Sequence, residues 1–240
     1  MILEKALNLF FPIKCGVCEK IGIPICKECE ENLKQYEINF MFKENIKIES
    51  LGNSFINKEL NFKDNIWDDK TNNNLKIQKI FIYKYQDIIR NLLINYKFYD
   101  ASYLANSFAY LIKNNKKIYS ILKSYDIIIP VPIHKKRMKE RGYNQSELIA
   151  KELARIAQIK CYKDILIKTK NNKPQSTLSG DLRKENVKNV YKLVNQEKIN
   201  NKKVLLFDDI YTTGTTVTEC ITGLKKANVK KIGVMTLAKD

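Results

Sequence analysis

The segment VLLFDDIYTTGTT, residues 204–216, places two adjacent carboxylates directly before a threonine-rich loop. Asp208 and Asp209 can accept hydrogen bonds from sugar hydroxyls or help to place a Mg²⁺ ion. The loop offers a phosphate hydroxyl groups, a glycine that permits close backbone approach, and the free N–H groups of a helix start. These positions are Thr212, Thr213, Gly214, Thr215 and Thr216. The segment therefore predicts a site for a molecule with a phosphate at one end and a diol at the other.

Two common phosphate-binding motifs are absent from the sequence. The chain contains neither the G-x-x-x-x-G-K-[ST] loop of P-loop proteins nor the G-x-G-x-x-G fingerprint of dinucleotide-binding folds. One alternative interpretation of residues 204–216 stays open, which is an acidic helix-capping region that binds no ligand.

Four of the six cysteines lie within fifteen residues and form two C-x-x-C pairs. They are Cys15, Cys18, Cys26 and Cys29. Two such pairs supply the four thiolates of a closed, structural Zn²⁺ site, and so short a segment cannot be held together by burial alone. Two disulfides or a redox dithiol are the alternatives, although a redox dithiol needs only one pair. Cys161 and Cys220 stand alone on apolar faces and are predicted to be core residues.

The elements that must position these residues follow an alternating strand and helix pattern from residue 79 onward. Apolar runs predict strands, and apolar residues at helical spacing predict helices at 104–112 and 217–224. Asn144 followed by Glu147 is typical of a helix N-cap with a reciprocal acid. The predicted strands are 79–85, 126–132, 164–168, 204–207 and 231–238. This pattern predicts an α/β fold with a parallel sheet flanked by helices and ligands at the carboxyl ends of the strands.

Composition divides the chain into unequal parts. Residues 1–64 hold 9 Lys and Arg against 10 Asp and Glu, a net charge of −1. Since the formal net charge of the chain is +17, the remaining 176 residues carry +18. This charge favours an anionic partner, although abundant Lys and Asn throughout the chain also fits a plain solvated surface. We expect a four-cysteine module at 1–35, a connecting segment at 36–78 and the α/β domain at 79–240.

The N-terminus and the apolar segments indicate where the protein works. The first residues carry Glu4 and lack a small-residue cleavage site, which argues against a signal peptide. No segment approaches 18 uninterrupted apolar residues, which argues against a membrane span. We therefore expect a cytoplasmic protein.

The acidic pair and threonine loop resemble the PRPP-binding signature of type I phosphoribosyltransferases at all thirteen positions. Three further features match a narrower group: PVPIHKKRMKERGYNQ at 130–145, KPQSTLSGDLRKENVKNVY at 173–191, and the preceding four-cysteine module. Together they resemble the ComF family of competence-associated, phosphoribosyltransferase-like proteins. The resemblance implies a type I phosphoribosyltransferase-like sheet domain with a small zinc-ribbon-like N-terminal module.

By this resemblance, Asp208 and Asp209 would bind the ribose hydroxyls of PRPP, and Thr212 to Thr216 would bind its 5′-phosphate. The segment NYKFYD resembles the pyrophosphate loop of the family and makes Lys97 the candidate cation. Family members often carry a glycine after the position of Phe98, where this chain has Tyr99 and Asp100. Mg²⁺ would accompany PRPP.

The segment HKKRMKER lies where phosphoribosyltransferases carry a mobile loop that closes over the substrate. Arg137 and Arg141 are candidates for contacts to pyrophosphate, because a guanidinium binds such groups with two parallel hydrogen bonds. The alternative is a basic helix start on the surface. His134, the only histidine, is a candidate proton donor or a structural residue.

The long segment before residues 204–207 also matches the family pattern. The matching positions are Gln175, Arg183 and Asn186, and Lys168 and Lys170 stand where family members often have arginines. The sequence assigns these residues no chemical role.

Two functions stay open. The first is an enzyme that transfers the phosphoribosyl group of PRPP to an unidentified acceptor and releases pyrophosphate. The second is an accessory protein of DNA uptake that handles single-stranded DNA and keeps the PRPP site as a ligand sensor. Lys135, Lys136 and Arg137 would contact the strand, and Tyr96, Tyr99 and Tyr143 would stack on its bases. The competence DNA-uptake machinery would then be a partner.

Overall fold

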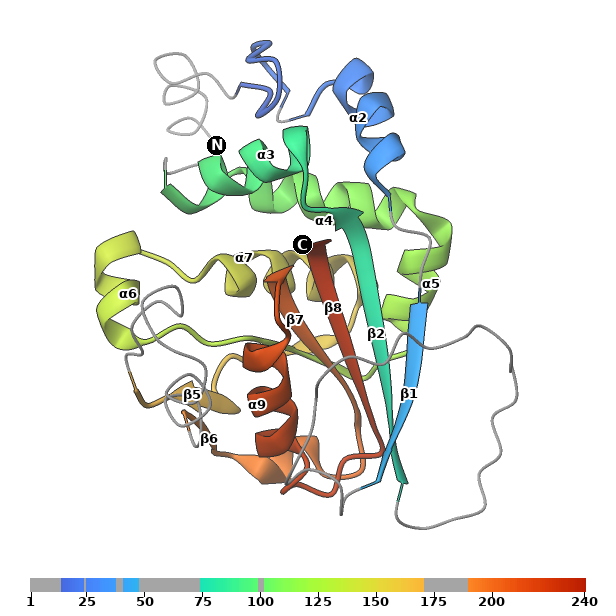
Figure 1. The fold of residues 1–240 in the computed structure, drawn as a ribbon, viewed down its shortest axis with the longest axis vertical. Helices are drawn as coiled ribbons and strands as arrows, with labels where there is room; N and C mark the ends of the chain where they lie inside the picture. Colours follow the sequence, from blue (N-terminus) through green and yellow to red (C-terminus); the bar gives the residue numbers. More distant parts are fainter. Residues whose placement is uncertain (1–13, 24, 38–40, 48–73, 99–101, 171–189) are drawn as a thin grey trace.

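The computed structural model describes six ranges of the 240-residue chain: 14–23, 25–37, 41–47, 74–98, 102–170 and 190–240. Within them a six-stranded sheet has the order β1-β2-β8-β7-β3-β4 (Figure 1). Its strands are β1 (Met41–Lys47), β2 (Asn74–Lys84), β3 (Ile127–Pro130), β4 (Lys160–Cys161), β7 (Lys203–Tyr211) and β8 (Lys231–Lys239).

Five neighbouring strands of this sheet, β2, β8, β7, β3 and β4, run parallel, and β1 pairs antiparallel with β2 at one edge. The predicted parallel sheet is therefore confirmed. Because the parallel strands share one direction, the segments that follow β2, β3, β7 and β8 meet at one edge of the sheet. The sheet also extends beyond residue 79, since β2 begins at Asn74 and β1 lies in the predicted connecting segment.

One predicted strand lies outside this sheet. Residues 166–168 form β5 (Leu166–Lys168), which pairs antiparallel with β6 (Tyr191–Leu193) in a separate two-stranded sheet. The position beside β3 is taken by β4, which the sequence did not predict because it is only two residues long. The β5–β6 pair packs on the helix that follows β7, as Leu166 lies close to Gly223.

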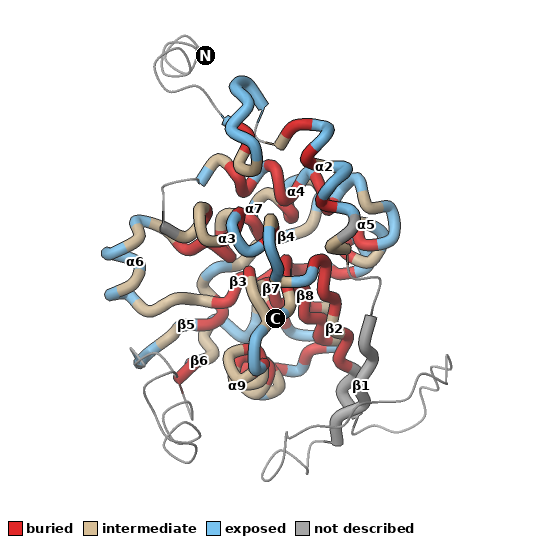
Figure 2. The backbone as a smooth tube through the Cα atoms, turned by 45° about the horizontal axis from the view of Figure 1, so that its top comes forward, coloured by how far each residue is buried: buried red, intermediate tan, exposed pale blue. Residues whose placement is uncertain are grey.

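The sheet has a hydrophobic core on each face. Leu205 and Phe207 belong to one core, whereas Val204 and Leu206 belong to the other, and all four side chains are fully buried. Successive residues of a strand point to opposite faces, so an unbroken apolar run marks a strand covered on both sides. Figure 2 shows the central strands buried over most of their length.

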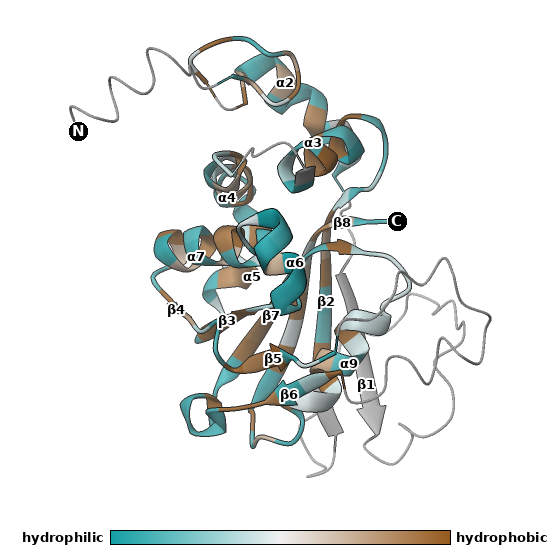
Figure 3. Cartoon of the chain, turned by 90° about the vertical axis from the view of Figure 1, so that its left-hand side faces the viewer, coloured by the Kyte–Doolittle hydropathy of each residue, from teal (hydrophilic) through white to brown (hydrophobic). Residues whose placement is uncertain are grey.

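Helices cover both faces, and Figure 3 shows α4, α5 and α7 on one side of the strands and α9 on the other. The helices are α2 (Lys27–Leu33), α3 (Asp87–Phe98), α4 (Leu104–Asn114), α5 (Lys116–Lys123), α6 (Lys135–Arg141), α7 (Gln145–Ala157) and α9 (Thr215–Leu224), with short 3₁₀ turns at Lys34–Tyr36 and Gln196–Ile199. The predicted helix at 104–112 is confirmed, since Leu104, Phe108, Leu111 and Ile112 are buried against the core.

The start of α7 differs in part from the prediction. Asn144 is the N-cap, and its Oδ1 accepts a hydrogen bond from the Ser146 N–H at 3.2 Å. Glu147 is paired instead with Lys151 at 2.7 Å and with Lys163 at 3.5 Å. Two ammonium groups within reach attract the carboxylate away from the reciprocal capping position.

The four-cysteine module packs on the middle of α3 and on both ends of α4. Gly16 lies so close to Leu92 and Leu104 that a Cβ atom at this position would fall 2.7 Å and 3.0 Å from their side chains. Asn114 of α4 also donates a hydrogen bond to Glu30 of α2 at 3.0 Å. Among the described residues, no helix is both long and apolar enough to cross a membrane.

Candidate functional site

Asp208 and Asp209 lie inside strand β7, where it is still paired with β8, and not after the end of the strand. The sequence predicted that the strand ends at Phe207, but β7 continues to Tyr211 because β8 extends beside it, with Asp208 opposite Thr236. Both carboxylates therefore stand on a strand that is hydrogen-bonded along one side. This backbone is more rigid than a loop, which fixes the directions of the two side chains.

Each carboxylate has its own set of partners. The Asp208 Oδ1 accepts hydrogen bonds from the Ser146 hydroxyl at 2.9 Å and from the Asp209 N–H at 3.0 Å. Asp209 forms a salt bridge with Lys97 at 2.8 Å and accepts a hydrogen bond from the Ile210 N–H at 2.8 Å. The pair is thus joined to α7 through Ser146 and to α3 through Lys97.

The electrostatics of the pair favour a proton or a cation. Burial and the adjacent charge of Asp209 raise the pKa of Asp208 to about 7, although the hydrogen bonds from Ser146 and the Asp209 N–H and the charge of Lys97 oppose this shift. A carboxyl group that is half neutral near pH 7 donates and accepts hydrogen bonds with hydroxyl groups. This behaviour suits a sugar diol.

The threonine loop joins β7 to α9 as the sequence predicted. Thr212 and Thr213 are exposed, Thr215 and Thr216 are half-buried, and the Thr213 and Thr215 hydroxyl oxygens lie 2.8 Å apart. The first N–H groups of α9 have no partner inside the helix, because an α-helix leaves its initial donors unpaired. The loop therefore gathers hydroxyl and N–H donors at one helix end.

Gly214 is required by the shape of this loop. Its φ is +76°, and a Cβ atom would lie 2.2 Å from the Tyr211 hydroxyl oxygen and 2.6 Å from the adjacent ring carbon. The Tyr211 side chain therefore packs directly on Gly214. The close approach of a phosphate to Gly214 stays a prediction.

Lys97 stands in the last turn of α3 and not in a loop. Its carbonyl oxygen is 3.5 Å from the Gln145 Nε2, and the Gln145 Oε1 accepts a hydrogen bond from Arg141 at 3.3 Å. Gln145 thus joins the end of α6 to the end of α3. Tyr99 and Asp100, which follow Lys97 in the NYKFYD segment, lie outside the described residues.

The segment HKKRMKER forms the short helix α6. His134 is its N-cap, with Nδ1 accepting a hydrogen bond from the Lys136 N–H at 3.2 Å, so this histidine has a structural task. Lys135 and Lys136 are exposed, whereas Arg137 and Arg141 are half-buried. Residues four apart lie on the same face of a helix, so both arginines share the face that is not turned to solvent.

Two tyrosines that the sequence offered for base stacking have other tasks. Tyr96 is fully buried, and its hydroxyl donates to the Gln145 carbonyl oxygen at 2.9 Å. Tyr143 is half-buried and donates to the Tyr96 carbonyl oxygen at 2.8 Å. The stacking role of Tyr96 is therefore wrong, because its ring packs edge-on against Phe108 in the core. Gln175, Arg183 and Asn186 lie outside the described residues.

Sequence reasoning missed Ser146 and Tyr191. Ser146 lies 62 residues before Asp208 and meets it only because α7 begins near β7. Tyr191 on β6 has its ring 5.5 Å from the Lys168 ammonium group. Tyr191 ends the family-like segment at 173–191, but its type and spacing indicated no contact with Lys168, and no pattern in the sequence linked Ser146 to Asp208.

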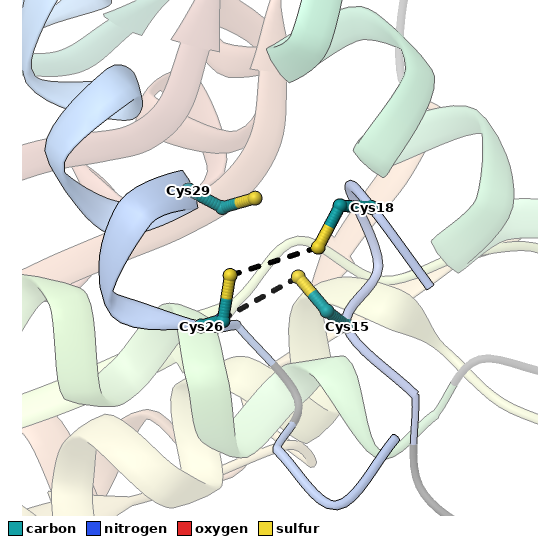
Figure 4. A group of neighbouring side chains, drawn as sticks. All are labelled: Cys15, Cys18, Cys26 and Cys29. Carbon is teal, nitrogen blue, oxygen red and sulfur yellow. Dashed lines mark hydrogen bonds between the residues drawn. The ribbon is translucent and has the colours of Figure 1, made fainter. Parts of the chain in front are cut away.

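The four cysteines of the module form one cluster, shown in Figure 4. All four sulfur atoms lie within 4.8 Å of one another, and those of Cys18 and Cys26 are 3.6 Å apart. A tetrahedral ion with Zn–S bonds of about 2.3 Å places its sulfurs roughly 3.8 Å apart, so the cluster fits such an ion. A single cluster of four also fits zinc better than two separate disulfides.

The environment of the cluster lowers the pKa of Cys15 and raises the pKa of Cys18 and Cys29. Burial opposes ionisation of Cys15, but the backbone N–H groups of Cys18, Cys26 and Val17 lower its pKa to about 7. Burial and then the neighbouring thiols raise the pKa of Cys29. Four thiols that hinder one another's ionisation gain from a divalent cation, which stabilises all the thiolates together. Cys161 and Cys220 pack in the cores, as predicted.

Comparisons with known proteins agree with this architecture. A family model described as "Phosphoribosyl transferase domain" matches residues 144–240. "Competence protein F" of Haemophilus influenzae is 32% identical over 164 residues, which are 67% of this chain and 72% of that protein. "Competence protein ComFC" of Bacillus subtilis is 26% identical over 183 residues, 73% of this chain and 70% of that protein.

A further relative matches over a shorter region. "DNA utilization protein YhgH" of Escherichia coli O6:H1 is 35% identical over 94 residues, 39% of this chain and 40% of that protein. The α/β part is therefore a phosphoribosyltransferase-type domain with a four-cysteine cluster beside it. From the identity with competence protein F and the 72% of that protein that the match covers, we conclude that the chain belongs to the ComF family.

Proposed function

We propose that the chain binds PRPP with Mg²⁺. The observation that carries this proposal is the acidic pair on β7, held by Ser146 and Lys97 directly before the donor-rich start of α9. Asp208 and Asp209 would accept hydrogen bonds from the ribose 2′- and 3′-hydroxyls. Thr212 to Thr216 and the first turn of α9 would hold the 5′-phosphate.

The pyrophosphate end needs cations at a distance from the phosphate loop. Lys97 lies at the end of α3, and Gln145 links it to Arg141 at the end of α6. We propose that these two cations bind the pyrophosphate. Positive charge at this place stabilises the negative charge that develops on the leaving group. Mg²⁺ would supply further charge neutralisation when it is bound with PRPP.

The reaction that suits this geometry is a displacement at C1 of the ribose. The bond from C1 to the pyrophosphate oxygen breaks and the leaving pyrophosphate keeps the electron pair. A lone pair of the acceptor forms the new bond to C1, and the acceptor loses its proton. The matched phosphoribosyl transferase family model supports this class of reaction.

Thermal unfolding tests the ligand. PRPP with Mg²⁺ should raise the Tm of the wild-type chain and should do so far less when EDTA is present. The double variant Asp208→Asn/Asp209→Asn should lose the shift. Glu152→Gln, a half-buried acid on α7 paired with Arg155, is the matched control and should keep it. No Tm shift of the wild type at millimolar PRPP would contradict the proposal.

A role in DNA uptake is the second proposal. The names of the relatives, "Competence protein F" and "DNA utilization protein YhgH", support it, as does the exposure of Lys135 and Lys136 on α6. In this function the protein handles single-stranded DNA in the cytoplasm, together with the DNA-uptake machinery, and PRPP acts as a substrate or as a sensed ligand.

Fluorescence anisotropy with a labelled single strand tests the DNA contact. Lys135→Ala/Lys136→Ala should weaken binding and reduce its salt dependence, because each phosphate contact releases counterions. Lys116→Ala/Lys117→Ala, an exposed lysine pair at the start of α5, is the matched control. Equal losses in both double variants would show that α6 is not a specific contact.

A further inference from the structure

The four-cysteine module bridges helix α4 and leaves a cavity beside it. Gly16 of the module packs on Leu104, the first residue of α4, and Glu30 of α2 accepts a hydrogen bond from Asn114, the last residue. A cavity of about 700 Å³ is lined by the module, by α4 and by the last turn of α7, and its α4 residues all fall between these two contacts, at positions 106–113. Figure 3 shows α2 above α4 and α7 below it. The walls of the cavity are therefore already fixed to one another in the unliganded protein.

Most of the lining of this cavity is apolar. The described ranges contain five large apolar residues that are exposed, and two of them, Ile23 and Tyr110, line the cavity. Exposed apolar side chains that gather at one concave place are typical of a binding site, and sites for small molecules have volumes of about 300–1,000 Å³. The apolar lining residues are Ile23, Ile25, Ala109, Tyr110, Leu111 and Ile156.

One buried polar group of the lining has no partner. Ser107 is 6% exposed, and its hydroxyl oxygen forms no hydrogen bond with any described residue. A buried hydroxyl without a partner costs free energy, and a ligand that accepts its hydrogen bond removes this cost. Ser107 therefore indicates a hydrogen-bond acceptor on the ligand.

Positive charge predominates among the ionisable groups of the lining, which are Lys27, Glu30, Lys113 and Arg155. Arg155 is paired with an acid of its own helix, and Glu30 accepts the hydrogen bond from Asn114. Lys27 and Lys113 are exposed, and neither forms a salt bridge with a described residue. These two lysines favour an anionic group on the ligand.

We propose that the cavity binds a small molecule with an apolar body and one carboxylate, the chemistry of a medium-chain fatty acid. The apolar body packs on Ile23, Tyr110 and the other apolar residues of the lining. The carboxylate accepts a hydrogen bond from Ser107 and charge-assisted hydrogen bonds from Lys27 and Lys113, because its two oxygens offer about four acceptor positions.

A ligand with one anionic group suits this lining better than a DNA strand does. Such a strand carries a phosphate at every nucleotide and binds along a basic surface, whereas most of this lining is apolar. The lining includes no residue of the acidic pair, the threonine loop or α6. The inference therefore goes beyond the proposed function and does not depend on PRPP.

Isothermal titration calorimetry on the full chain, without PRPP, tests the site. The probe is decanoate below its micelle concentration, and the control ligands are decanol, which lacks the charge, and acetate, which lacks the apolar body. Decanoate should bind the wild type at about one molecule per chain, and both control ligands should bind at least about tenfold more weakly.

Two variants separate the charged and the apolar parts of the site. Lys27→Met/Lys113→Met should weaken decanoate binding about tenfold and leave decanol binding unchanged, because it removes only the charges. Tyr110→Ala should weaken the binding of decanoate and decanol alike, because it removes apolar contact area. Lys116→Met is the matched control and should bind like the wild type, since Lys116 is an exposed lysine of α5 that does not line the cavity.

Ser107→Ala tests the unpaired hydroxyl. The substitution removes no hydrogen bond between described residues of the unliganded protein, so the Tm without decanoate should not fall. The affinity for decanoate should fall about threefold or more, because the carboxylate loses a donor. A lower Tm with unchanged affinity would overturn the role of Ser107 in binding.

Three results overturn the whole proposal. They are an absence of binding heat with decanoate, equal affinities for decanoate and decanol, and unchanged decanoate affinity in both Lys27→Met/Lys113→Met and Tyr110→Ala. If decanoate does not bind but phosphatidylglycerol vesicles do, and Lys27→Met/Lys113→Met abolishes that binding, the lining belongs to a membrane-surface contact instead. Circular dichroism and the Tm report whether each variant is folded, and the substituted Lys27, Lys113 and Tyr110 are all exposed.

Discussion

At the scale of single residues, the acidic pair is held together at a cost in stability. Asp208 is held beside Asp209 although burial and the neighbouring charge raise its pKa to about 7. The groups that act on it are Asp209 on its own strand, Ser146 from α7 and Lys97 from α3. A carboxyl group with this pKa keeps its proton in the folded state at a pH where the unfolded chain has lost it.

Asp208→Asn should therefore stabilise the unliganded protein above neutral pH. The folded-state pKa is raised, so the stability that this proton contributes is complete below about pH 4 and is lost as the pH rises through about 7. The asparagine cannot ionise. The free energy of unfolding of Asp208→Asn, relative to that of the wild type, should therefore rise between pH 5 and pH 8 by roughly 1–2 kcal/mol. Urea unfolding without PRPP or Mg²⁺ measures this difference.

Asp164→Asn is a control for which we expect the opposite pH dependence of the free energy of unfolding. A hydrogen bond from Lys198 lowers the pKa of Asp164, so this carboxylate contributes stability that is lost as the pH falls. The two variants should shift the pH profile of stability in opposite directions. A pH-independent difference between Asp208→Asn and wild type would contradict the shifted pKa.

Gly214→Ala should destabilise the protein more than Gly142→Ala. Both glycines have a positive φ, +76° and +77°, but a Cβ atom has open space at Gly142 and meets the Tyr211 side chain at Gly214. The strained backbone costs about 1 kcal/mol in each variant, and displacement of Tyr211 adds about 1–2 kcal/mol at Gly214 only. Urea unfolding measures both values, and equal losses would show that Tyr211 moves aside at no cost.

At the scale of elements, α7 is the helix that completes the acidic pair. Its N-cap Asn144 has a second task, because the Nδ2 donates a hydrogen bond to the Val131 carbonyl oxygen at 3.0 Å. This bond ties the start of α7 to the segment after β3 and so places Ser146 opposite Asp208. The Asn144 side chain is buried, and both its amide oxygen and its amide nitrogen form hydrogen bonds.

Asn144→Ala should accordingly cost more than the loss of an ordinary cap. Removing an N-cap costs about 1 kcal/mol, and leaving the buried Val131 carbonyl oxygen without a partner adds about 1–2 kcal/mol. Asn115→Ala is the matched control, since Asn115 caps α5 by accepting from the Ile118 N–H and lies in a part-buried position. Chemical unfolding of the two variants gives the comparison, and equal costs would mean that the Val131 contact adds nothing.

The same elements show how far the sequence was informative. The acidic pair, the threonine loop and the cysteine pairs are contiguous, so their chemistry was readable without a structure. The end of β7 was predicted too early because Asp208 and Asp209 interrupt the apolar run, whereas β8 continues the pairing to Tyr211. Lys97 was predicted as a loop residue because nothing local shows that α3 ends there.

Contacts between distant segments were beyond sequence reasoning. The pairing of β5 with β6 and the packing of this small sheet against α9 join residues that are far apart in the sequence. Periodicity identifies a strand but does not say which sheet it joins. The family resemblance indicated the fold and the ligand, and it left the role of Lys168 unassigned.

At the scale of the whole molecule, the cysteine cluster holds together a short segment that joins the large core through Leu33, with Val17 and Ile25 packed against that core. Within the described residues, the module has a small core made by three cysteines with Val17 and Ile25. Such a core is too small to fold without a metal. Its outer connections are the packing of Gly16 on Leu92 and Leu104 and the bond between Asn114 and Glu30.

Cys29→Ser should therefore remove the metal and release the module. The purified wild type should contain about one zinc per chain by elemental analysis, and the variant far less, with increased proteolysis before residue 37. Cys161→Ser is the matched control, because Cys161 is a half-buried thiol outside the cluster. A wild-type chain without zinc, or a variant that keeps it, would contradict the assignment.

The packing of the module on α3 has a thermodynamic consequence for the sugar site. Leu92, against which Gly16 packs, and Lys97, which pairs with Asp209, stand on the same helix. A metal at the cysteine cluster and PRPP at the acidic pair would then both favour the ordered state of α3. If a metal at the cysteine cluster strengthens PRPP binding through this helix, linkage requires that PRPP strengthen metal binding by the same free energy. The protein would thus respond to the zinc supply and to the PRPP supply as one combined signal.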